Sequence, residues 1–205
     1  MNTNKHSFNI FDFGGGDGTI SLLLSEILLA HGTKNIIVYL TDYDASIKRS
    51  TSSAIEFKCA KLTEYPENFF DLGIASASLE HVPECRQTLI HLLHSLKKGG
   101  VLYFRTPHIY PLMKLLRSFL IEFSFGYPAH LYDLGEQFWN KILTYLPIKD
   151  EYALIHSQPA ITESTLHSAF FRTLFAKTLK APWWVIGPRY KLVGGWEGLL
   201  KRSSE

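Results

Sequence analysis

Short apolar runs alternate with helix-patterned segments along the first half of the chain. The continuous apolar character of 35–40 is typical of a strand buried on both faces of a sheet. Segments 20–29 and 83–98 instead carry apolar residues at helical spacing. Strands that alternate with helices predict an α/β fold with a doubly wound parallel sheet. The five strands expected here are 8–13, 35–40, 54–59, 70–75 and 101–105.

Capping residues suggest where these helices begin and end. Asp17 is the expected N-cap of the first helix, and Gly32 is expected to end it. Pro83 suits the first turn of the second helix. Because glycine ends helices and lysine complements the helix dipole, Lys-Lys-Gly-Gly at 97–100 is expected to be the C-cap. A short helix is expected at 45–50.

The pattern is weaker after Pro107. Helices are expected at 110–123, 134–146 and 162–180, with Thr162 as an N-cap, and strands at 152–156, 183–186 and 196–201. A final hairpin with an antiparallel last strand would complete a seven-stranded, mostly parallel sheet flanked by helices. The whole chain, 1–205, is then a single domain.

Composition and charge narrow the class of protein. The chain has 205 residues, of which 46% are hydrophobic and 20% charged, as in soluble globular domains. A net charge of +2 from scattered basic residues gives no reason to expect a nucleic-acid partner. No leader peptide and no run of ~18 apolar residues is visible, so we expect a cytoplasmic protein.

The sulfur and imidazole side chains do not predict a metal site. Cys59 and Cys85 lack metal-ligand spacing and are expected to be buried and reduced. His91 and His94 lie in the middle of a predicted helix without acidic partners at ligand spacing. We therefore expect no metal ion.

A glycine-rich loop, Asp-Phe-Gly-Gly-Gly-Asp-Gly at 12–18, separates the first strand from the first helix. Glycines permit positive φ and a close approach of ligand to backbone, and the helix start offers unpaired N–H groups. Nicotinamide and flavin enzymes prefer Gly-x-Gly-x-x-Gly. This chain does not match that motif, because counted from Gly14 the third glycine would fall at position 19, which is threonine. A purely structural turn is the alternative interpretation.

Four segments, in order over 8–107, resemble the class I S-adenosylmethionine-dependent methyltransferases. They are the glycine loop, Asp42 at the end of the second strand, Leu-Glu-His-Val at 79–82, and Leu-Lys-Lys-Gly-Gly at 96–100. The resemblance implies the class I methyltransferase fold and S-adenosylmethionine as the cofactor.

The resemblance also implies roles for individual residues. The loop would wrap the methionine part of the cofactor, whose ammonium Asp12 would attract directly or through water. Asp42 would accept hydrogen bonds from the ribose, and Tyr43 or a neighbouring apolar side chain would lie against adenine. The family often has an acidic residue after strand three, where this chain has Cys59, so backbone near Ala60 is expected to contact adenine. The expected cofactor-binding residues are Asp12, Gly14, Gly15, Gly16, Gly18, Asp42, Tyr43, Ala60 and Ser76.

His81 is the candidate general base. It follows strand four at the sheet edge where ligands bind, and its pKa range suits proton removal. The alternative is a loop histidine that shapes the pocket, and Glu80 is interpreted as structural. His108 and His130 also lie in segments expected on the acceptor side.

We therefore expect methyl transfer from S-adenosylmethionine to a small-molecule or glycan acceptor, at oxygen. The glycan follows from a resemblance of 182–197 to bacterial methyltransferases found with surface-polysaccharide genes. Segment 109–146 is expected to be a helical lid at the acceptor site. A peripheral membrane contact or a dimer face are alternative roles for this segment. The alternatives are a non-catalytic S-adenosylmethionine-binding regulatory or scaffold module and, less favoured, a nicotinamide-dependent oxidoreductase.

Overall fold

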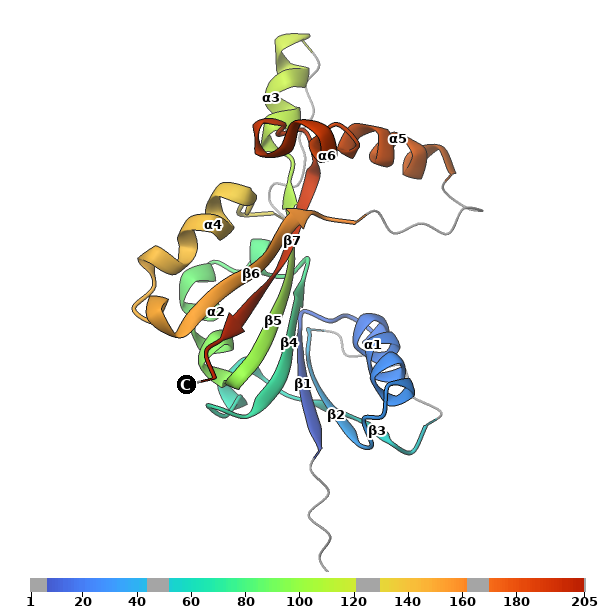
Figure 1. The fold of residues 1–205 in the computed structure, drawn as a ribbon, viewed down its shortest axis with the longest axis vertical. Helices are drawn as coiled ribbons and strands as arrows, with labels where there is room; N and C mark the ends of the chain where they lie inside the picture. The colour runs from blue at the N-terminus through green and yellow to red at the C-terminus, as the bar shows by residue number, and fades with distance from the viewer. Residues whose placement is uncertain (1–6, 44–51, 121–129, 162–169, 205) are drawn as a thin grey trace, which may run out of the picture.

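A single seven-stranded sheet forms the centre of the protein (Figure 1). The computed structural model describes residues 7–43, 52–120, 130–161 and 170–204. The strand order is β3-β2-β1-β4-β5-β7-β6. Pairing is parallel from β3 to β5, whereas β7 runs antiparallel to both β5 and β6. This confirms the predicted class I methyltransferase fold. The strands are β1 (Phe8–Phe13), β2 (Ile36–Thr41), β3 (Ile55–Cys59), β4 (Phe70–Ser76), β5 (Leu96–His108), β6 (Tyr152–Pro159) and β7 (Gly194–Arg202).

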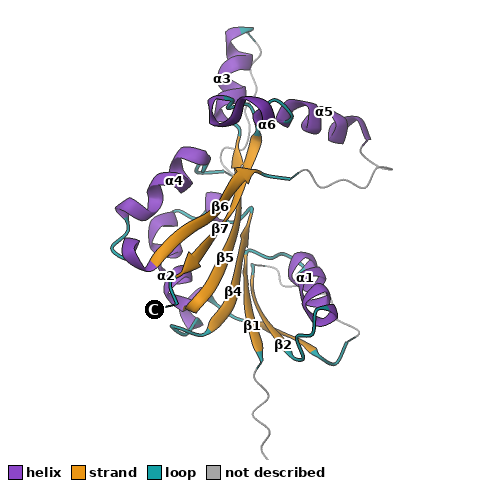
Figure 2. Ribbon diagram, in the orientation of Figure 1, coloured by secondary structure: helices purple, strands orange, loops and turns teal. Residues whose placement is uncertain are grey.

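Helices cover both faces of this sheet (Figure 2). Leucines of α1 pack on one face against a cluster that includes Ile10 and Val38. On the other face, α2 and α4 pack against Phe11, Phe70 and Phe104. Helices α3, α5 and α6 lie beyond the carboxyl end of β5 (Figure 1). The helices are α1 (Thr19–Ala30), α2 (Cys85–Ser95), α3 (Tyr110–Ser118), α4 (Glu136–Tyr145), α5 (Phe170–Lys180) and α6 (Trp183–Ile186).

Helix α4 is an integral part of the core. Trp139 is fully buried and stacks on Phe104 of β5, with 3.5 Å between ring centroids. Its indole N–H donates to Thr106 Oγ1 at 3.0 Å, and the Thr106 hydroxyl donates to the Leu134 carbonyl at 2.6 Å. Removing α4 would therefore expose the sheet beneath it.

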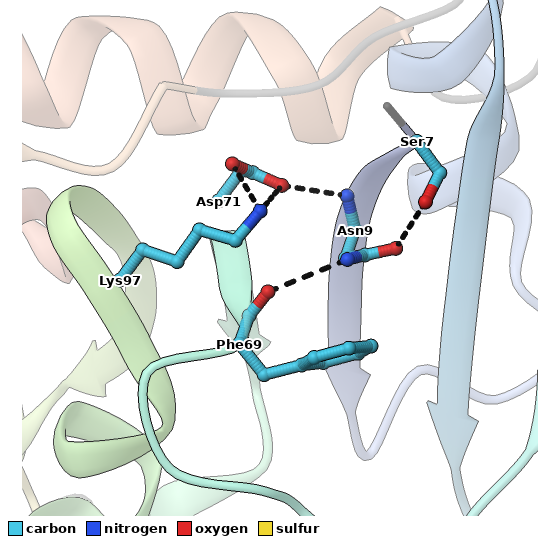
Figure 3. Close-up of polar contacts among 5 residues, drawn as sticks. All are labelled: Ser7, Asn9, Phe69, Asp71 and Lys97. Atoms are coloured by element: carbon cyan, nitrogen blue, oxygen red, sulfur yellow. Dashed lines mark hydrogen bonds and ion pairs between the residues drawn. The ribbon is translucent and has the colours of Figure 1, made fainter. Parts of the chain in front are cut away.

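A polar cluster ties together the amino ends of three neighbouring strands (Figure 3). The Asp71 carboxylate accepts from the backbone N–H of Asn9 at 2.8 Å, and Lys97 Nζ lies 2.8 Å from each of its oxygens. The Asn9 side chain also donates to the Phe69 carbonyl at 3.4 Å. These contacts join β1, β4 and β5 at the end of the sheet remote from the glycine loop.

The second predicted helix ends earlier than expected. Helix α2 spans Cys85–Ser95, so Pro83 precedes it, and 97–100 belongs to β5 instead of forming a cap. The reason is non-local, because Leu96 pairs with Phe70 of β4 and draws the chain into the sheet. The capping prediction for this segment was wrong.

Three further expectations need correction. The predicted strand at 183–186 is helix α6, and the final hairpin is formed by β6 and β7. The first helix has Gly18 as its N-cap, while Asp17 Oδ1 accepts from the Thr19 N–H at 3.0 Å. Cys59 is exposed, whereas Cys85 is buried. The helix expected at 45–50 and the N-cap at Thr162 fall outside the described residues.

Candidate functional site

A cavity of about 760 Å³ opens at the carboxyl ends of β1, β2 and β4. Ligands of open α/β sheets bind at this edge, where the strand order reverses. Apart from Thr88 of α2, the lining residues lie at the carboxyl ends of β1 to β4 or in the segments that follow these strands. The lining residues are Phe13, Gly14, Thr41, Asp42, Tyr43, Ala60, Lys61, Leu62, Ala77, Ser78, His81, Val82 and Thr88.

The glycine loop forms one wall and has no room for side chains at two positions. Gly14 has a φ of +68°, and a Cβ there would lie 2.5 Å from Ser78 Cβ. A Cβ on Gly15 would lie 2.5 Å from Asp12 Oδ2. By contrast, a Cβ on Gly16 would meet no atom within 4 Å. The loop backbone is thus closely packed against Asp12 and Ser78, whereas at Gly16 there is space beside it.

Asp12 lies directly beneath this loop. Its side chain is buried, with 1% of its surface exposed, and within the described residues its Oδ2 has no hydrogen-bond partner. Burial raises the pKa of Asp12 from 3.8 to about 6, hydrogen bonds from Ser21 lower it, and the nearby Asp42 carboxylate raises it further. Two carboxylates therefore make this end of the cavity favourable for a cation.

Asp42 continues from β2 into the cavity wall. Its Oδ2 accepts a 2.7 Å hydrogen bond from the backbone N–H of Gly16. This contact fixes the end of β2 against the glycine loop. The next side chain, Tyr43, lines the cavity but is otherwise fully exposed to solvent.

Ala60, Lys61 and Leu62 form the wall that follows β3. Both backbone groups of Ala60 already have partners, since its N–H donates to the Leu40 carbonyl at 3.0 Å and its carbonyl accepts from Thr41 Oγ1 at 2.5 Å. The N–H of Lys61 donates to Glu64 Oε2 at 2.9 Å. This wall can therefore offer a ligand mainly the side chains of Ala60, Lys61 and Leu62.

His81 lines the opposite wall, just after β4. Its side chain is 41% exposed, and its Nε2 lies 4.0 Å from Oε1 of the buried Glu80. The ring of His130 packs against it, with 4.7 Å between centroids. The other candidate histidine, His108, has its Nδ1 3.6 Å from Asp133 Oδ2 and is not among the lining residues.

The structure gathers only part of the predicted set around the cavity. Gly14, Asp42, Tyr43, Ala60 and His81 line it. Asp12, Gly15, Gly16 and Gly18 lie in or beneath the loop, and Ser76 is not among the lining residues, although Ala77 and Ser78 after it are.

Sequence reasoning missed Leu62 and Ser78. Ser78 could have been suspected, since it lies in the turn that follows strand four, whereas Ser76 is the last residue of β4. No local pattern marks Leu62, which reaches the wall through the short turn after β3. The described residues within 109–146 do not contribute to the lining, although His130 lies beside His81.

Within the described residues, each helix is too short or too polar to serve as a membrane span.

Comparison with known proteins gives a family match and several structural relatives. The family model described as a methyltransferase domain matches residues 2–140. No curated protein shows significant sequence similarity to the chain. Similar solved structures include an S-adenosylmethionine-dependent methyltransferase from Methanosarcina mazei, with a TM-score of 0.57, 19% identity, and coverage of 96% of this chain and 93% of that one.

Two other similar structures are a further methyltransferase and a cyclase. The plantazolicin methyltransferase BpumL, solved in complex with SAH, has a TM-score of 0.58 and 15% identity over 96% of this chain and 76% of its own. The [4+2]-cyclase SpnF has a TM-score of 0.56 and 17% identity over 97% of this chain and 76% of its own. These likenesses support the fold.

Proposed function

This chain belongs to the methyltransferase domain family, and from that premise we propose that it transfers a methyl group from S-adenosylmethionine to a hydroxyl group of a small-molecule or glycan acceptor. It is an S-adenosylmethionine-dependent methyltransferase of class I, with the seven-stranded sheet of that class. The acceptor and the methylated oxygen are the proposed parts.

The single observation that carries the proposal is the carboxylate beneath the glycine loop. A buried carboxylate oxygen without a partner is costly, and a cation offsets that cost. Asp12 Oδ2 is such an oxygen, under a loop whose outer side is open at Gly16. The ammonium of the methionine part of S-adenosylmethionine supplies the matching charge. The pyrophosphate of a nicotinamide dinucleotide would instead face two carboxylates, Asp12 and Asp42.

The remaining walls fit the nucleoside part of the cofactor. Asp42 has a carboxylate in the cavity wall that is already hydrogen-bonded to Gly16 on one oxygen, so it can accept from ribose hydroxyls. Leu62 and Ala60 offer a small apolar surface to the adenine ring. Tyr43, which is exposed and lines the cavity, is proposed to cover the other side of the ring.

S-adenosylmethionine supplies a methyl group that is already activated on a sulfonium. The acceptor oxygen attacks the methyl carbon, the carbon–sulfur bond breaks, and the electron pair stays on sulfur. The protein has to align the acceptor and exclude water. His81 is the proposed base that takes the hydroxyl proton, because its half-exposed ring lies in the cavity wall.

We place the acceptor on the side of segment 109–146. His130 packs on His81, and Asp133 accepts hydrogen bonds from the N–H groups of Ile109 and Tyr110 at 3.0 and 2.8 Å. The start of α3 and the loop that carries His130 are thus joined next to the catalytic candidate. This arrangement suits a lid that orients the acceptor.

A second function is favoured by one comparison. SpnF shares this fold and is a [4+2]-cyclase, and a fold alone does not fix chemistry. A module that binds S-adenosylmethionine without transferring its methyl group is therefore the competing hypothesis.

Calorimetry followed by an activity screen separates the hypotheses. We expect binding of S-adenosylmethionine and S-adenosylhomocysteine and no heat with NAD, and release of S-adenosylhomocysteine in the presence of phenolic, sugar or lipid-linked sugar acceptors. Binding without turnover across the panel would favour the non-catalytic module. Binding of NAD alone would contradict the cofactor assignment.

A further inference from the structure

One carboxylate and two imidazoles meet beside the mouth of the cavity. Glu80, His81 and His130 each place a potential ligand atom within 4.8 Å of the other two. Glu80 Oε1 is 4.0 Å from His81 Nε2, and the two histidine rings are 4.7 Å apart. Glu80 and His81 follow β4, whereas His130 precedes α4, so the fold brings together residues from distant parts of the sequence.

Glu80 is the unusual member of this group. It is 1% exposed, and in the part of the chain that the structure describes its Oε2 has no hydrogen-bond partner. Burial of a carboxylate oxygen without a donor is unfavourable. The other oxygen of the same carboxylate, Oε1, lies 4.0 Å from His81 Nε2, and imidazole nitrogens, like carboxylate oxygens, can bind a cation. The Glu80 carboxylate therefore lies where a positive ion shared with the imidazoles would offset its burial.

His130 is held in place by contacts of its own loop. The N–H of Leu131 donates to the Glu80 carbonyl at 2.8 Å, and the Tyr132 hydroxyl donates to the Pro83 carbonyl at 2.6 Å. These two bonds fix the loop on the turn that carries Glu80 and His81. The proximity of the three side chains is thus built into the backbone packing.

We propose that Glu80, His81 and His130 bind a divalent transition-metal ion. Two imidazole nitrogens and one carboxylate oxygen form the ligand set of many zinc and non-haem iron sites. Mg²⁺ prefers oxygen ligands and near-octahedral geometry, so Zn²⁺ or Fe²⁺ fits better. Ligand atoms around such an ion lie roughly 3.4 Å apart, and small rotations of the two accessible rings close the remaining gap.

Three protein ligands leave at least one coordination position open. Because His81 lines the cavity, an ion held by it would lie beside the space assigned to the acceptor. This step rests on the proposed function: an acceptor oxygen bound there would lose its proton to solvent more readily, because a metal ion stabilises the resulting anion. The ion would then replace His81 as the group that activates the acceptor.

The test is metal binding by the full chain, without cofactor or acceptor. After treatment with a chelator, ZnCl₂ is titrated by calorimetry, and bound zinc is counted after dialysis. We expect one equivalent of tightly bound zinc. Glu80→Gln and His130→Ala should each weaken its binding at least tenfold, and MgCl₂ at the same concentration should give no heat. His156→Ala, on the remote strand β6, controls for surface histidines.

Unchanged zinc affinity in Glu80→Gln and His130→Ala would overturn the proposal, as would the absence of a tight equivalent in the unmodified protein. Circular dichroism and S-adenosylhomocysteine binding check that the variants are folded. If Glu80→Gln fails to fold, His130→Ala decides alone, because His130 lies in a partly exposed loop. A failed acceptor screen leaves the zinc result untouched, so the two proposals fail independently.

Discussion

The Asp42 carboxylate accepts a 2.7 Å hydrogen bond from the backbone N–H of Gly16, which joins the end of β2 to the glycine loop. The loop after the first strand and the acidic residue after the second therefore form one wall of the cavity. The contact holds the Asp42 carboxylate in the part of the wall where we propose that the ribose binds. Its removal should affect the cofactor more than the fold.

We predict that Asp42→Ala weakens S-adenosylhomocysteine binding by about 1–3 kcal/mol, because hydrogen bonds to a charged acceptor are lost. Isothermal titration calorimetry measures this change. Asp150→Ala, an exposed carboxylate in the turn before β6, is the matched control and should bind as the unmodified protein does. An unchanged dissociation constant for Asp42→Ala would show that the ribose assignment is wrong.

The affinity for cofactor should depend on pH through Asp12. The pKa of this buried carboxyl group is raised to about 6 in the free protein. Its charged form, which we propose attracts the ammonium, therefore becomes fully populated only above that value. We expect S-adenosylhomocysteine affinity to fall as pH is lowered from 7.5 to 5, approaching tenfold per unit at the acid end. Calorimetry at several pH values should show a flat profile for Asp12→Asn, and a profile unchanged by that substitution would contradict the assignment.

The same group should cost stability in the free protein. Its pKa is raised above 3.8 in the folded state, so the stabilising effect of the protonated form is present below about pH 3.8 and lost as pH rises through about 6. Asp12→Asn should therefore raise the free energy of unfolding at pH 7.5 by about 1–2 kcal/mol while it weakens cofactor binding. Urea denaturation without ligand measures the effect, and the gain should disappear at pH 4. A loss of stability at pH 7.5 would argue that Asp12 has a partner that the folded protein needs.

The alternation of strands and helices was sufficient to predict the sheet, but not the limits of its elements. Local patterns identified β1 to β4 almost to the residue. They failed at 97–100, where lysines and glycines suit a helix cap but the pairing of Leu96 with Phe70 decides the structure. They failed again at α6, whose aromatic and β-branched residues favour a strand but lie outside the sheet.

The residues of the candidate site likewise fall into those that a local motif predicts and those that it does not. The glycine loop and Asp42 lie at fixed positions relative to their strands, so a local motif was enough to propose them. The fit of Ser78 against Gly14 and the meeting of Glu80 with His130 depend on how separate segments pack. No pattern within one segment could show that Glu80 is buried beside two imidazoles.

Gly15→Ala should damage the site through a steric clash. Its Cβ would lie 2.5 Å from Asp12 Oδ2, inside van der Waals contact, so the loop must shift. We expect a loss of about 1–3 kcal/mol in stability and a clear weakening of S-adenosylhomocysteine binding.

Gly187→Ala is the control for this prediction. Gly187 also lies in a turn, with φ +70°, but a Cβ there would have no neighbour within 4 Å. It also lies away from the cavity. It should show backbone strain in thermal unfolding and normal cofactor binding. Equal binding by both variants would argue against the close packing of loop and carboxylate.

The proposed role of segment 109–146 in acceptor recognition can be tested without removing the core. Deleting the whole segment would take away Trp139, which is fully buried. Replacing only 112–129 avoids this problem. Because Asp133 bonds to the N–H groups of Ile109 and Tyr110, the two ends of the excision lie close together, and a linker of about six glycine and serine residues spans them.

We expect the variant to keep its fold and S-adenosylhomocysteine affinity, because the described residues of this segment do not line the cavity. Methylation of an acceptor identified in the screen should fall by about 100-fold or more, since a poorly oriented acceptor loses the advantage of proximity. The same linker inserted after Gly32, in the exposed turn between α1 and β2, should leave turnover intact. Turnover that survives the replacement would show that residues outside 112–129 recognise the acceptor. Loss of cofactor binding in a folded variant would instead assign 112–129 to the cofactor site.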